Sequence, residues 1–276
     1  MLSMATKLRA KKFQSIIFSW WKNHKRDLPW RRTHDPYKIL VSEVMLQQTQ
    51  VCRVLTKYDE FMAMFPTVQV LARASTADVL RAWKGMGYNR RALYLKRCAE
   101  SIVKEHKGKF PQKEKELTQL PGVGTYTARA ILVFAFKKDV AAVDTNIRQI
   151  IEHFFYEDIP PKPSVIQKTA EKLVPKGKSW QWHQALMDYG SREMSKVKGK
   201  RKKGKQGETP FKDTNRFFRG RIMDLLRGKA WKENELTSEM NIKYDRSEEF
   251  IIGIIDGLMK DGLIIRTGND ILCLPE

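Results

Sequence analysis

One stretch of the sequence, residues 120–146, most strongly limits what the chain can fold into. It begins Leu-Pro-Gly-Val-Gly-Thr-Tyr-Thr-Ala and ends Ala-Val-Asp-Thr-Asn. Pro121, Gly122 and Gly124 predict a tight turn before a helix over residues 125–136, because glycine permits positive φ and a close backbone approach. The first N–H groups of a helix have no internal partners and bind anions such as a phosphate. By itself such a turn is an ordinary helix start, so the residues around it decide its meaning.

Those surrounding residues resemble one family. Asp144 heads another predicted helix, and upstream lie Leu-Pro-Trp-Arg at 28–31 and Ser-Glu-Val-Met-Leu-Gln-Gln-Thr-Gln at 42–50. Together with the hairpin they resemble the helix-hairpin-helix DNA glycosylase superfamily, and within it the adenine DNA glycosylase branch (MutY type). The resemblance covers roughly residues 10–194, and the string at 42–50 is far more specific than the hairpin. It implies that the hairpin grips DNA phosphates and that Asp144 lies in the pocket for the flipped base.

The resemblance also implies a role for each residue of these motifs. Glu43 would protonate the adenine and position a water molecule, and Asp144 would stabilise the developing cation. Tyr126 would hydrogen-bond near the sugar, while Asn146 would hold Asp144 in place. The other implied contacts are the base pocket (Trp30 and Arg31), the base opposite the flipped one (Gln48 and Thr49), a wedge in the duplex (Tyr88) and the phosphates (Gly122, Val123, Gly124 and Thr125). For Trp30 and Tyr88, packing in the core is the alternative.

The two acids also suit this chemistry by their own surroundings. Breaking the bond between a purine and deoxyribose needs a proton on the leaving base and a charge that stabilises an oxocarbenium-like sugar. The base must first leave the stack. Glu43 lies among apolar residues of a predicted helix, where desolvation favours the protonated form. Asp144 begins a helix, whose dipole and free N–H groups favour the ionised form.

Tyr126 determines whether the strand is cut after the base has been released. It stands where the lyase-competent relatives of the endonuclease III branch carry a lysine, and without an amine no Schiff base with the opened sugar can form there. The sequence therefore predicts a monofunctional enzyme that leaves an abasic site. Tyrosine also occurs at this position in a thymine-mismatch branch, so Tyr126 does not select adenine.

The chain departs from the family pattern in three places. Four closely spaced cysteines for an iron–sulfur cluster usually come after the sequence Met-Asp-Tyr-Gly at 187–190, and here there are none. We therefore expect no cofactor and no metal, with a monovalent cation at the hairpin as the one ion left open. The usual carboxy-terminal domain that checks for 8-oxoguanine is not recognisable, which puts that discrimination in doubt. Asn89 and Thr145 stand where a tyrosine and a glycine are common.

The charge balance indicates a polyanionic partner. The sequence holds 52 Lys and Arg against 31 Asp and Glu, a net charge of +21, which favours nucleic acid. The expected partner is double-stranded DNA with a mismatch or lesion. Residues 196–206 are rich in like charges, which repel and do not pack. Within them Lys200, Arg201, Lys202 and Lys203 are expected to contact phosphates, and a solvated linker is the alternative.

Nothing in the sequence indicates a membrane or a secretory route. No apolar run approaches the ~20 residues that span a bilayer, and the N-terminus lacks the apolar core and cleavage site of a secretory signal. The cysteines are few, odd in number and widely spaced, which argues for reduced thiols. We expect a monomer in the cytoplasm, associated with the nucleoid.

The periodicity of the apolar residues predicts a mostly α fold, with helical segments over roughly 67–83 and 89–107 among others. A two-lobed helix-hairpin-helix glycosylase core, with a cleft between its lobes, is expected over residues 1–194, followed by a basic linker over 195–212. Residues 213–276 predict a small winged-helix-like domain, with helices at 216–226, 233–240 and 247–260 and strands at 262–266 and 271–274. Such a domain binds DNA or another protein, and the pattern leaves both open.

The sequence thus predicts a glycosylase of base excision repair that hydrolyses the N-glycosidic bond of adenine mispaired with guanine or 8-oxoguanine. A mismatch thymine or uracil glycosylase of the same fold is the first alternative, against which the string at 42–50 argues. A non-enzymatic DNA-binding protein that uses only the hairpin and the winged helix is the second. The presence of both Glu43 and Asp144 argues against it.

Overall fold

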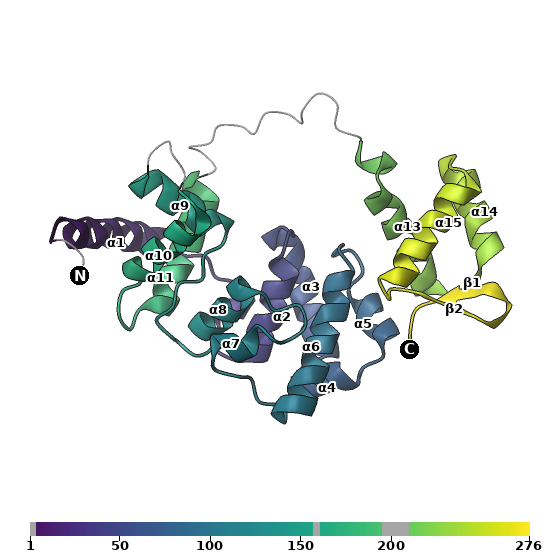
Figure 1. Ribbon diagram of the computed structural model, residues 1–276, viewed down its shortest axis with the longest axis horizontal. Coiled ribbons are helices and arrows are strands. Elements are labelled where there is room, and N and C mark those ends of the chain that lie inside the picture. Colours follow the sequence, from purple (N-terminus) through teal and green to yellow (C-terminus); the bar gives the residue numbers. More distant parts are fainter. Residues whose placement is uncertain (1–3, 157–160, 195–209) are drawn as a thin grey trace. The chain divides into compact units, whose positions relative to one another are not determined.

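The computed structural model describes residues 4–156, 161–194 and 210–276, and helices dominate these ranges (Figure 1). The mostly α fold predicted from the sequence is therefore confirmed. None of the described helices combines the length and the apolar character needed to cross a membrane. In chain order the elements are α1 (Met4–His24), η1 (Pro29–Arg31), α2 (Pro36–Leu46), α3 (Val51–Met64), α4 (Val68–Arg73), α5 (Thr76–Ala82), α6 (Arg90–His106), α7 (Glu114–Leu117), α8 (Thr125–Phe134), α9 (Thr145–Phe155), α10 (Pro163–Leu173), α11 (Ser179–Tyr189), η2 (Gly190–Met194), η3 (Phe211–Asp213), α13 (Asn215–Gly228), β1 (Trp231–Lys232), α14 (Glu233–Tyr244), α15 (Glu248–Lys260), β2 (Ile265–Thr267), η4 (Gly268–Asp270) and β3 (Ile271–Cys273).

The chain divides into two compact units, and each unit joins two segments that are distant in sequence. Unit 1 consists of Met1–Glu43 and Phe110–Lys203, and unit 2 consists of Val44–Lys109 and Gly204–Glu276. The domain boundaries predicted from the sequence remain predictions. Most of the predicted linker, residues 195–209, lies outside the described residues.

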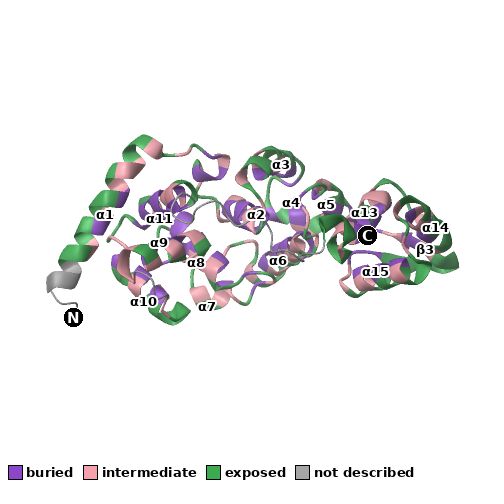
Figure 2. Ribbon diagram, turned by 90° about the horizontal axis from the view of Figure 1, so that it is seen from above, coloured by how far each residue is buried: buried purple, intermediate pink, exposed green. Residues whose placement is uncertain are grey.

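Unit 1 is built on the packing of its first helix, α1, against α11. Exposed and buried residues alternate along α1 (Figure 2), as an amphipathic helix requires. Phe13 and Ile17 are buried on its inner side, and the ring of Phe13 meets that of Trp182 edge-on at 5.5 Å. Ile147 and Ile150 of α9 belong to the same apolar cluster. The cluster therefore fixes the helix whose first turn comes directly after Asp144.

The helical part of unit 2 packs α4 and α5 against the long helix α6. The sequence predicted one helical segment over residues 67–83, but the structure divides it at Ala74 and Ser75, which are extended. Ser75 Oγ accepts from the N–H of Asp78 at 3.0 Å and so caps a new helix. A serine three residues ahead of an acid is a signal for the start of a helix, and it marks this second helix in the sequence.

The C-terminal part of unit 2 contains the three helices and the strand pair that the sequence predicts, with one strand more. β1 and β2 both pair antiparallel with β3, so the strand order is β1-β3-β2. β1 escaped prediction because it has only two residues. The strand predicted at 262–266 begins at Ile265, since the N–H of Gly262 still bonds to the carbonyl of Met259 in the turn that ends α15.

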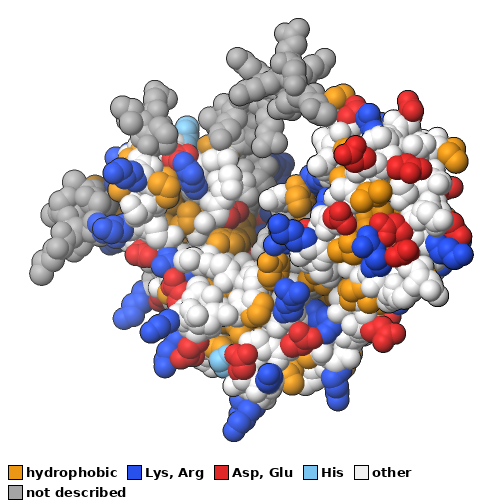
Figure 3. Space-filling model, turned by 45° about the vertical axis from the view of Figure 1, so that its right-hand side comes forward, with side chains coloured by type: hydrophobic (Ala, Val, Ile, Leu, Met, Phe, Trp, Pro, Cys, Tyr) orange, Lys and Arg blue, Asp and Glu red, His pale blue; other side chains and the backbone are white. Residues whose placement is uncertain are grey.

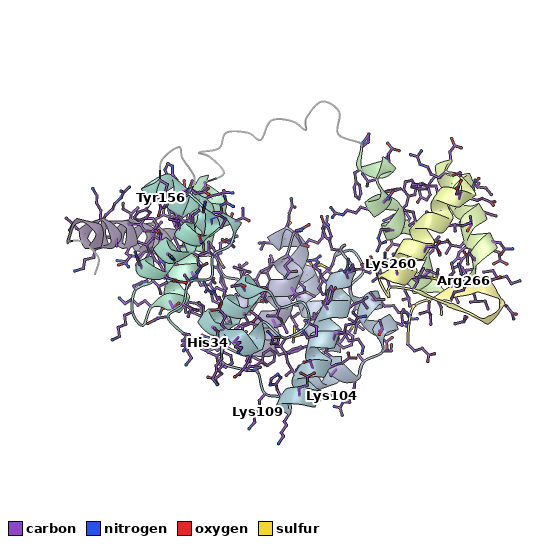
Figure 4. All side chains as sticks on the ribbon, viewed as in Figure 1. His34, Lys104, Lys109, Tyr156, Lys260 and Arg266 are labelled. Carbon is purple, nitrogen blue, oxygen red and sulfur yellow. The ribbon has the colours of Figure 1, made fainter. Side chains whose placement is uncertain are left out.

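The C-terminal part of unit 2 carries many acidic side chains, in contrast to the basic sequence as a whole. Arg266, labelled in Figure 4, donates to both carboxylate oxygens of Glu233 at 2.6 and 2.8 Å and joins β2 to α14. Glu248, Glu249 and Asp256 are exposed on α15, and Figure 3 shows acidic side chains among basic ones on the face that it draws. Since carboxylates repel phosphates, this helix is a poor candidate for gripping DNA.

Candidate active site

Glu43 lies near the end of α2 with its carboxyl group buried. Asp35 accepts from the N–H of Tyr37 at 2.8 Å and so starts the helix, with Pro36 at its first position. Because the inner side of this helix is apolar, Glu43 is only 7% exposed. Desolvation raises the pKa of Glu43 to about 7. An acid with such a pKa can deliver a proton near neutral pH.

Tyr126 and Asp144 are the polar groups that act on Glu43. The phenol of Tyr126, in the first turn of α8, donates a hydrogen bond to the Glu43 carboxylate and lowers its pKa, while the charge of Asp144 raises it to a smaller extent. Burial, and then the two negative charges, hold the pKa of Tyr126 well above its ordinary value. Tyr126 therefore stays protonated and remains a hydrogen-bond donor.

Asp144 caps α9 from the position just before the helix. Its Oδ1 accepts from the N–H of Ile147 at 2.7 Å, and its Oδ2 accepts from the side chain of Asn146 at 3.1 Å. Burial raises the pKa of Asp144 and outweighs these hydrogen bonds, which lower it, so the net shift is upward. The helix end alone favours the ionised form, as the sequence predicts, and desolvation of the carboxyl reverses the net direction. Glu43, Tyr126, Asp144 and Asn146 are thus brought together within unit 1.

A histidine that the sequence analysis missed holds the segment before Asp144. His183 of α11 is buried; its Nε2 accepts from the N–H of Ala142 at 3.0 Å, so its Nδ1 carries the proton and donates to the carbonyl of Ser179 at 2.7 Å. Burial lowers the pKa of His183 to about 4, and the ring keeps both bonds at neutral pH. A lone histidine on an apolar helix gives no signal for this role.

Gly190 lets the end of α11 approach the start of α9. A Cβ atom at Gly190 would lie 2.8 Å from Asn146 Cβ and 3.2 Å from Ile150 Cδ1, so no side chain fits there. In the sequence, Met-Asp-Tyr-Gly only marked the place after which cluster cysteines are usual. In the structure its glycine is a packing requirement of the helix that Asp144 caps.

The hairpin between α7 and α8 has the turn that the sequence predicts, although its two glycines differ. Gly122 has φ +75° and Val123 is buried, with its N–H bonded to the carbonyl of Leu120 at 3.1 Å. Gly124 has φ −82° and so does not use the positive φ that glycine permits, and an added Cβ would meet nothing within 4 Å. No side chain caps the first turn of α8, and Thr125 is exposed. This helix end is therefore open to an anion from outside.

Trp30 and Arg31 lie in the turn η1, and both are buried. The Arg31 guanidinium forms a bidentate ion pair with Asp188, with both N–O distances 2.8 Å. Arg26 and Trp21 donate to the same carboxylate. Burial alone would raise the pKa of Asp188, but Arg31 and the other donors hold it below its usual value. The charged end of Arg31 is thus engaged with Asp188, and its role in the base pocket stays a prediction.

In unit 2, one arginine joins the two loops to which the resemblance assigns contacts with the duplex. Arg91 Nη2 donates to Thr49 Oγ1 at 3.1 Å and to the carbonyls of Met86 and Gly87 at 2.9 and 3.0 Å. Its Nη1 donates at 2.6 to 2.9 Å to three carbonyls just before the first loop, those of Val44, Met45 and Gln47. Arg91 thereby holds together the loop with Gln48 and Thr49 and the loop that ends in Tyr88. Nothing in its sequence setting, a basic helix, indicates this role.

Two other expectations concern the basic residues at 200–203 and the cofactor. Lys200, Arg201, Lys202 and Lys203 lie outside the described residues. Among the residues that the structure describes, no group of three or more His, Cys, Asp or Glu could hold a metal ion.

The cysteines do not fit a four-cysteine iron–sulfur cluster. The chain has three in all, Cys52, Cys98 and Cys273, and all of them belong to unit 2. Burial raises the pKa of Cys98 to about 12, so this thiol is a poor metal ligand. That the protein works without a cofactor remains a prediction.

Known proteins resemble this chain in sequence over most of its length. A family described as the HhH-GPD superfamily base excision DNA repair protein matches residues 41–217. An adenine DNA glycosylase of Mycobacterium tuberculosis is 33% identical, over 94% of this chain and 92% of its own length, so that match extends into the C-terminal part. A thymine/uracil-DNA glycosylase of Methanothermobacter thermautotrophicus is 34% identical, over 68% of this chain and 86% of its own.

Solved structures show the same likeness in three dimensions. A thermostable thymine-DNA glycosylase superposes with a TM-score of 0.64 at 33% identity, covering 68% of this chain and 88% of that one. An endonuclease III in a non-covalent complex with DNA superposes with a TM-score of 0.60 at 19% identity, over 70% and 87% of the two chains. The second likeness concerns the fold alone.

Proposed function

The chain belongs to the HhH-GPD superfamily of base excision DNA repair proteins, and we propose that it removes adenine mispaired with guanine or 8-oxoguanine. It is a DNA glycosylase, a hydrolase of N-glycosyl bonds, and DNA is its partner. The observation that carries the proposal is the group of Glu43, Tyr126 and Asp144, which meet in unit 1 with a raised pKa on each acid. We further propose that it acts as a monomer on mismatched or damaged duplexes, in the cytoplasm at the nucleoid.

Two features support adenine as the base. The string at residues 42–50 resembles the adenine branch, and the match to the mycobacterial adenine glycosylase covers 94% of the chain, against 68% for the thymine/uracil relative. The identities are nearly equal, and Tyr126 is shared with the thymine branch. A mismatch thymine or uracil glycosylase is therefore the second candidate.

The proposed chemistry divides the work between the two acids. Glu43, with a pKa near 7, protonates the leaving base in its neutral form and then, ionised, activates a water molecule. Asp144 in its ionised form stabilises the oxocarbenium-like sugar. Tyr126 holds the Glu43 carboxylate by its hydrogen bond. Since a phenol cannot form a Schiff base, the reaction ends at the abasic site without cutting the strand.

A panel of labelled duplexes tests the proposal. Adenine is placed opposite guanine, 8-oxoguanine, cytosine or thymine, and thymine or uracil opposite guanine, and alkali then cleaves every abasic site. We expect cleavage of the adenine strand opposite guanine and 8-oxoguanine, and no covalent adduct trapped by borohydride. Cleavage only at thymine or uracil would establish the second candidate. Duplex binding without any excision would identify a non-enzymatic DNA-binding protein.

A further inference from the structure

Tyr88 ends a loop whose backbone is held in an unfavourable conformation. Gly85 and Gly87 have φ of +84° and +68°, and Tyr88, which has a side chain, also has positive φ at +46°. A non-glycine residue seldom adopts this region, because its Cβ atom crowds the backbone there, so its surroundings must hold it. The Tyr88 side chain is 38% exposed.

The main chain of this loop is held from within the helical part of unit 2. Arg91 Nη2 donates to the carbonyls of Met86 and Gly87, and Trp83 Nε1 donates to the carbonyl of Gly87 at 3.1 Å. These bonds fix the path of the backbone. They do not by themselves fix the direction of the exposed Tyr88 ring.

The nearer cation over the ring comes from the C-terminal part, since the guanidinium carbon of Arg91 lies 5.6 Å from the ring centre. Arg216, in the first turn of α13, lies with its guanidinium carbon 3.9 Å from the centre of the Tyr88 ring, and its Nη1 donates to the Tyr88 hydroxyl at 2.7 Å. One face of the ring is therefore covered by a planar cation. No carboxylate of the described residues forms an ion pair with Arg216, whereas other arginines of the C-terminal part do form such pairs, among them Arg219, Arg221, Arg227 and Arg246.

α13 is itself bonded to residues that precede and follow the loop that ends in Tyr88. Arg227 donates to the carbonyl of Leu80 and to the side chain of Asn89, both at 2.9 Å. Asp261, just beyond α15, pairs with Arg219 of α13 and with Arg90 of α6. Asn89 and Arg90 come directly after Tyr88 in the chain, so Arg216 is presented to the ring from a fixed helix.

We propose that Arg216 is a positioning residue through which the C-terminal part of the chain sets the Tyr88 ring for insertion into the duplex. The proposal rests on the proposed function and on the role of wedge that the resemblance implies for Tyr88. A preset ring enters the stack without losing rotamer freedom at that moment. The contact requires a planar guanidinium, because stacking and the hydrogen bond to the hydroxyl are made together.

The test measures strand opening directly and does not depend on excision of a base. The duplex carries an abasic-site analogue with 2-aminopurine beside it, whose fluorescence rises when it is unstacked. The wild-type protein should raise the signal, and Tyr88→Ala should abolish the rise. We expect Arg216→Ala to reduce the equilibrium for strand opening on the order of tenfold, equivalent to about 1.4 kcal/mol. Arg216→Lys should behave like Arg216→Ala, because lysine keeps the charge but cannot stack.

The matched control is Arg221→Ala, which removes the same charge from an exposed position of α13 that pairs with Asp224 and does not touch Tyr88. It should leave the signal unchanged, and thermal unfolding should be the same for both alanine variants. The proposal is overturned if Arg216→Ala matches this control, if Arg216→Lys restores opening, or if Tyr88→Ala has no effect. A wild-type protein that opens the duplex but excises no mispaired base would instead disprove the proposed function alone.

Discussion

At the scale of single residues, the proposed catalytic role of Glu43 is linked to the stability of the fold. The pKa of Glu43 is raised from 4.5 in the reference state to about 7 in the fold, so the folded protein binds this proton more tightly than the unfolded chain does. Tighter proton binding by the folded state therefore contributes fully to the free energy of unfolding below about pH 4.5, and this contribution is lost as pH rises through 7. A difference of this size corresponds to about 3 kcal/mol at most. The burial that makes Glu43 an acid thus makes its ionised form costly.

Glu43→Gln should separate these two effects. Excision under single-turnover conditions should fall by ~10²–10⁴-fold, while duplex binding is retained. Because glutamine carries no charge, denaturant unfolding should show the variant gaining stability over the wild type between pH 5 and pH 8. For the wild type, the excision rate should decline above about pH 7 as Glu43 loses its proton. A variant that excises at a near-normal rate would refute the assignment.

Tyr126→Phe should shift that pH profile. The phenol lowers the pKa of Glu43, so its loss should raise that pKa further and move the declining limb of the single-turnover rate to higher pH. Tyr94→Phe, on α6 in unit 2, is the control and should leave the profile in place. A shift of the limb to lower pH in Tyr126→Phe would contradict the hydrogen bond.

The candidate site residues could be selected from the sequence, but the contacts that support them could not. Glu43 and Asp144 stand in specific strings, and desolvation of Glu43 follows from its apolar helix. His183 acts on Ala142 and Arg91 acts on Met45, across dozens of residues, and such pairs leave no local pattern. The net pKa shift of Asp144 depends on tertiary burial in the same way.

At the scale of elements, the open end of α8 can be probed by a substitution that the fold tolerates. Gly124→Ala should leave the thermal unfolding temperature nearly unchanged, because an added Cβ meets nothing within 4 Å. Duplex binding in a fluorescence anisotropy titration should weaken if a phosphate approaches this helix end. Gly122→Ala, at φ +75°, should destabilise the fold instead. Unchanged binding by Gly124→Ala would place the phosphate elsewhere.

The contact between α11 and α9 gives a second element-scale prediction. Gly190→Ala should destabilise the protein by about 1–3 kcal/mol, because the new Cβ would lie 2.8 Å from Asn146 Cβ. It should also slow excision by displacing the side chain that bonds to Asp144. Gly253→Ala on α15 is the control, since its Cβ meets nothing, and it should be neutral or stabilising by up to about 1 kcal/mol. Equal unfolding temperatures for the two variants would disprove the packing argument.

Helix positions followed from periodicity, and the errors arose where a local signal was short. Residues 67–83 have one apolar pattern, yet the serine cap at Ser75 divides them. β1, with two residues, exists only because β3 lies beside it. Neither feature changes the average hydrophobic pattern that a sequence window detects.

At the scale of the whole molecule, the excess charge should appear in the salt dependence of binding. Deleting residues 196–206 should weaken binding to every duplex alike and reduce the slope of log K against log salt by roughly 0.9 for each lost phosphate contact. Excision at saturating enzyme should change little, because no residue of the acid site is removed. An unchanged slope would mean that the run is a solvated linker.

The division of both units between distant segments has a consequence for synthesis. The ring of Phe13 packs on Trp182, so the N-terminal helix emerges from the ribosome long before its partner does. At about 5–20 residues per second this delay is on the order of ten seconds or more. Glu43 likewise acquires its raised pKa only after the segments that bury it, with Tyr126 and Asp144, have been made. A nascent or prematurely terminated chain therefore exposes the apolar side of α1 to chaperones and proteases and lacks the buried Glu43 carboxyl that the proposed chemistry requires.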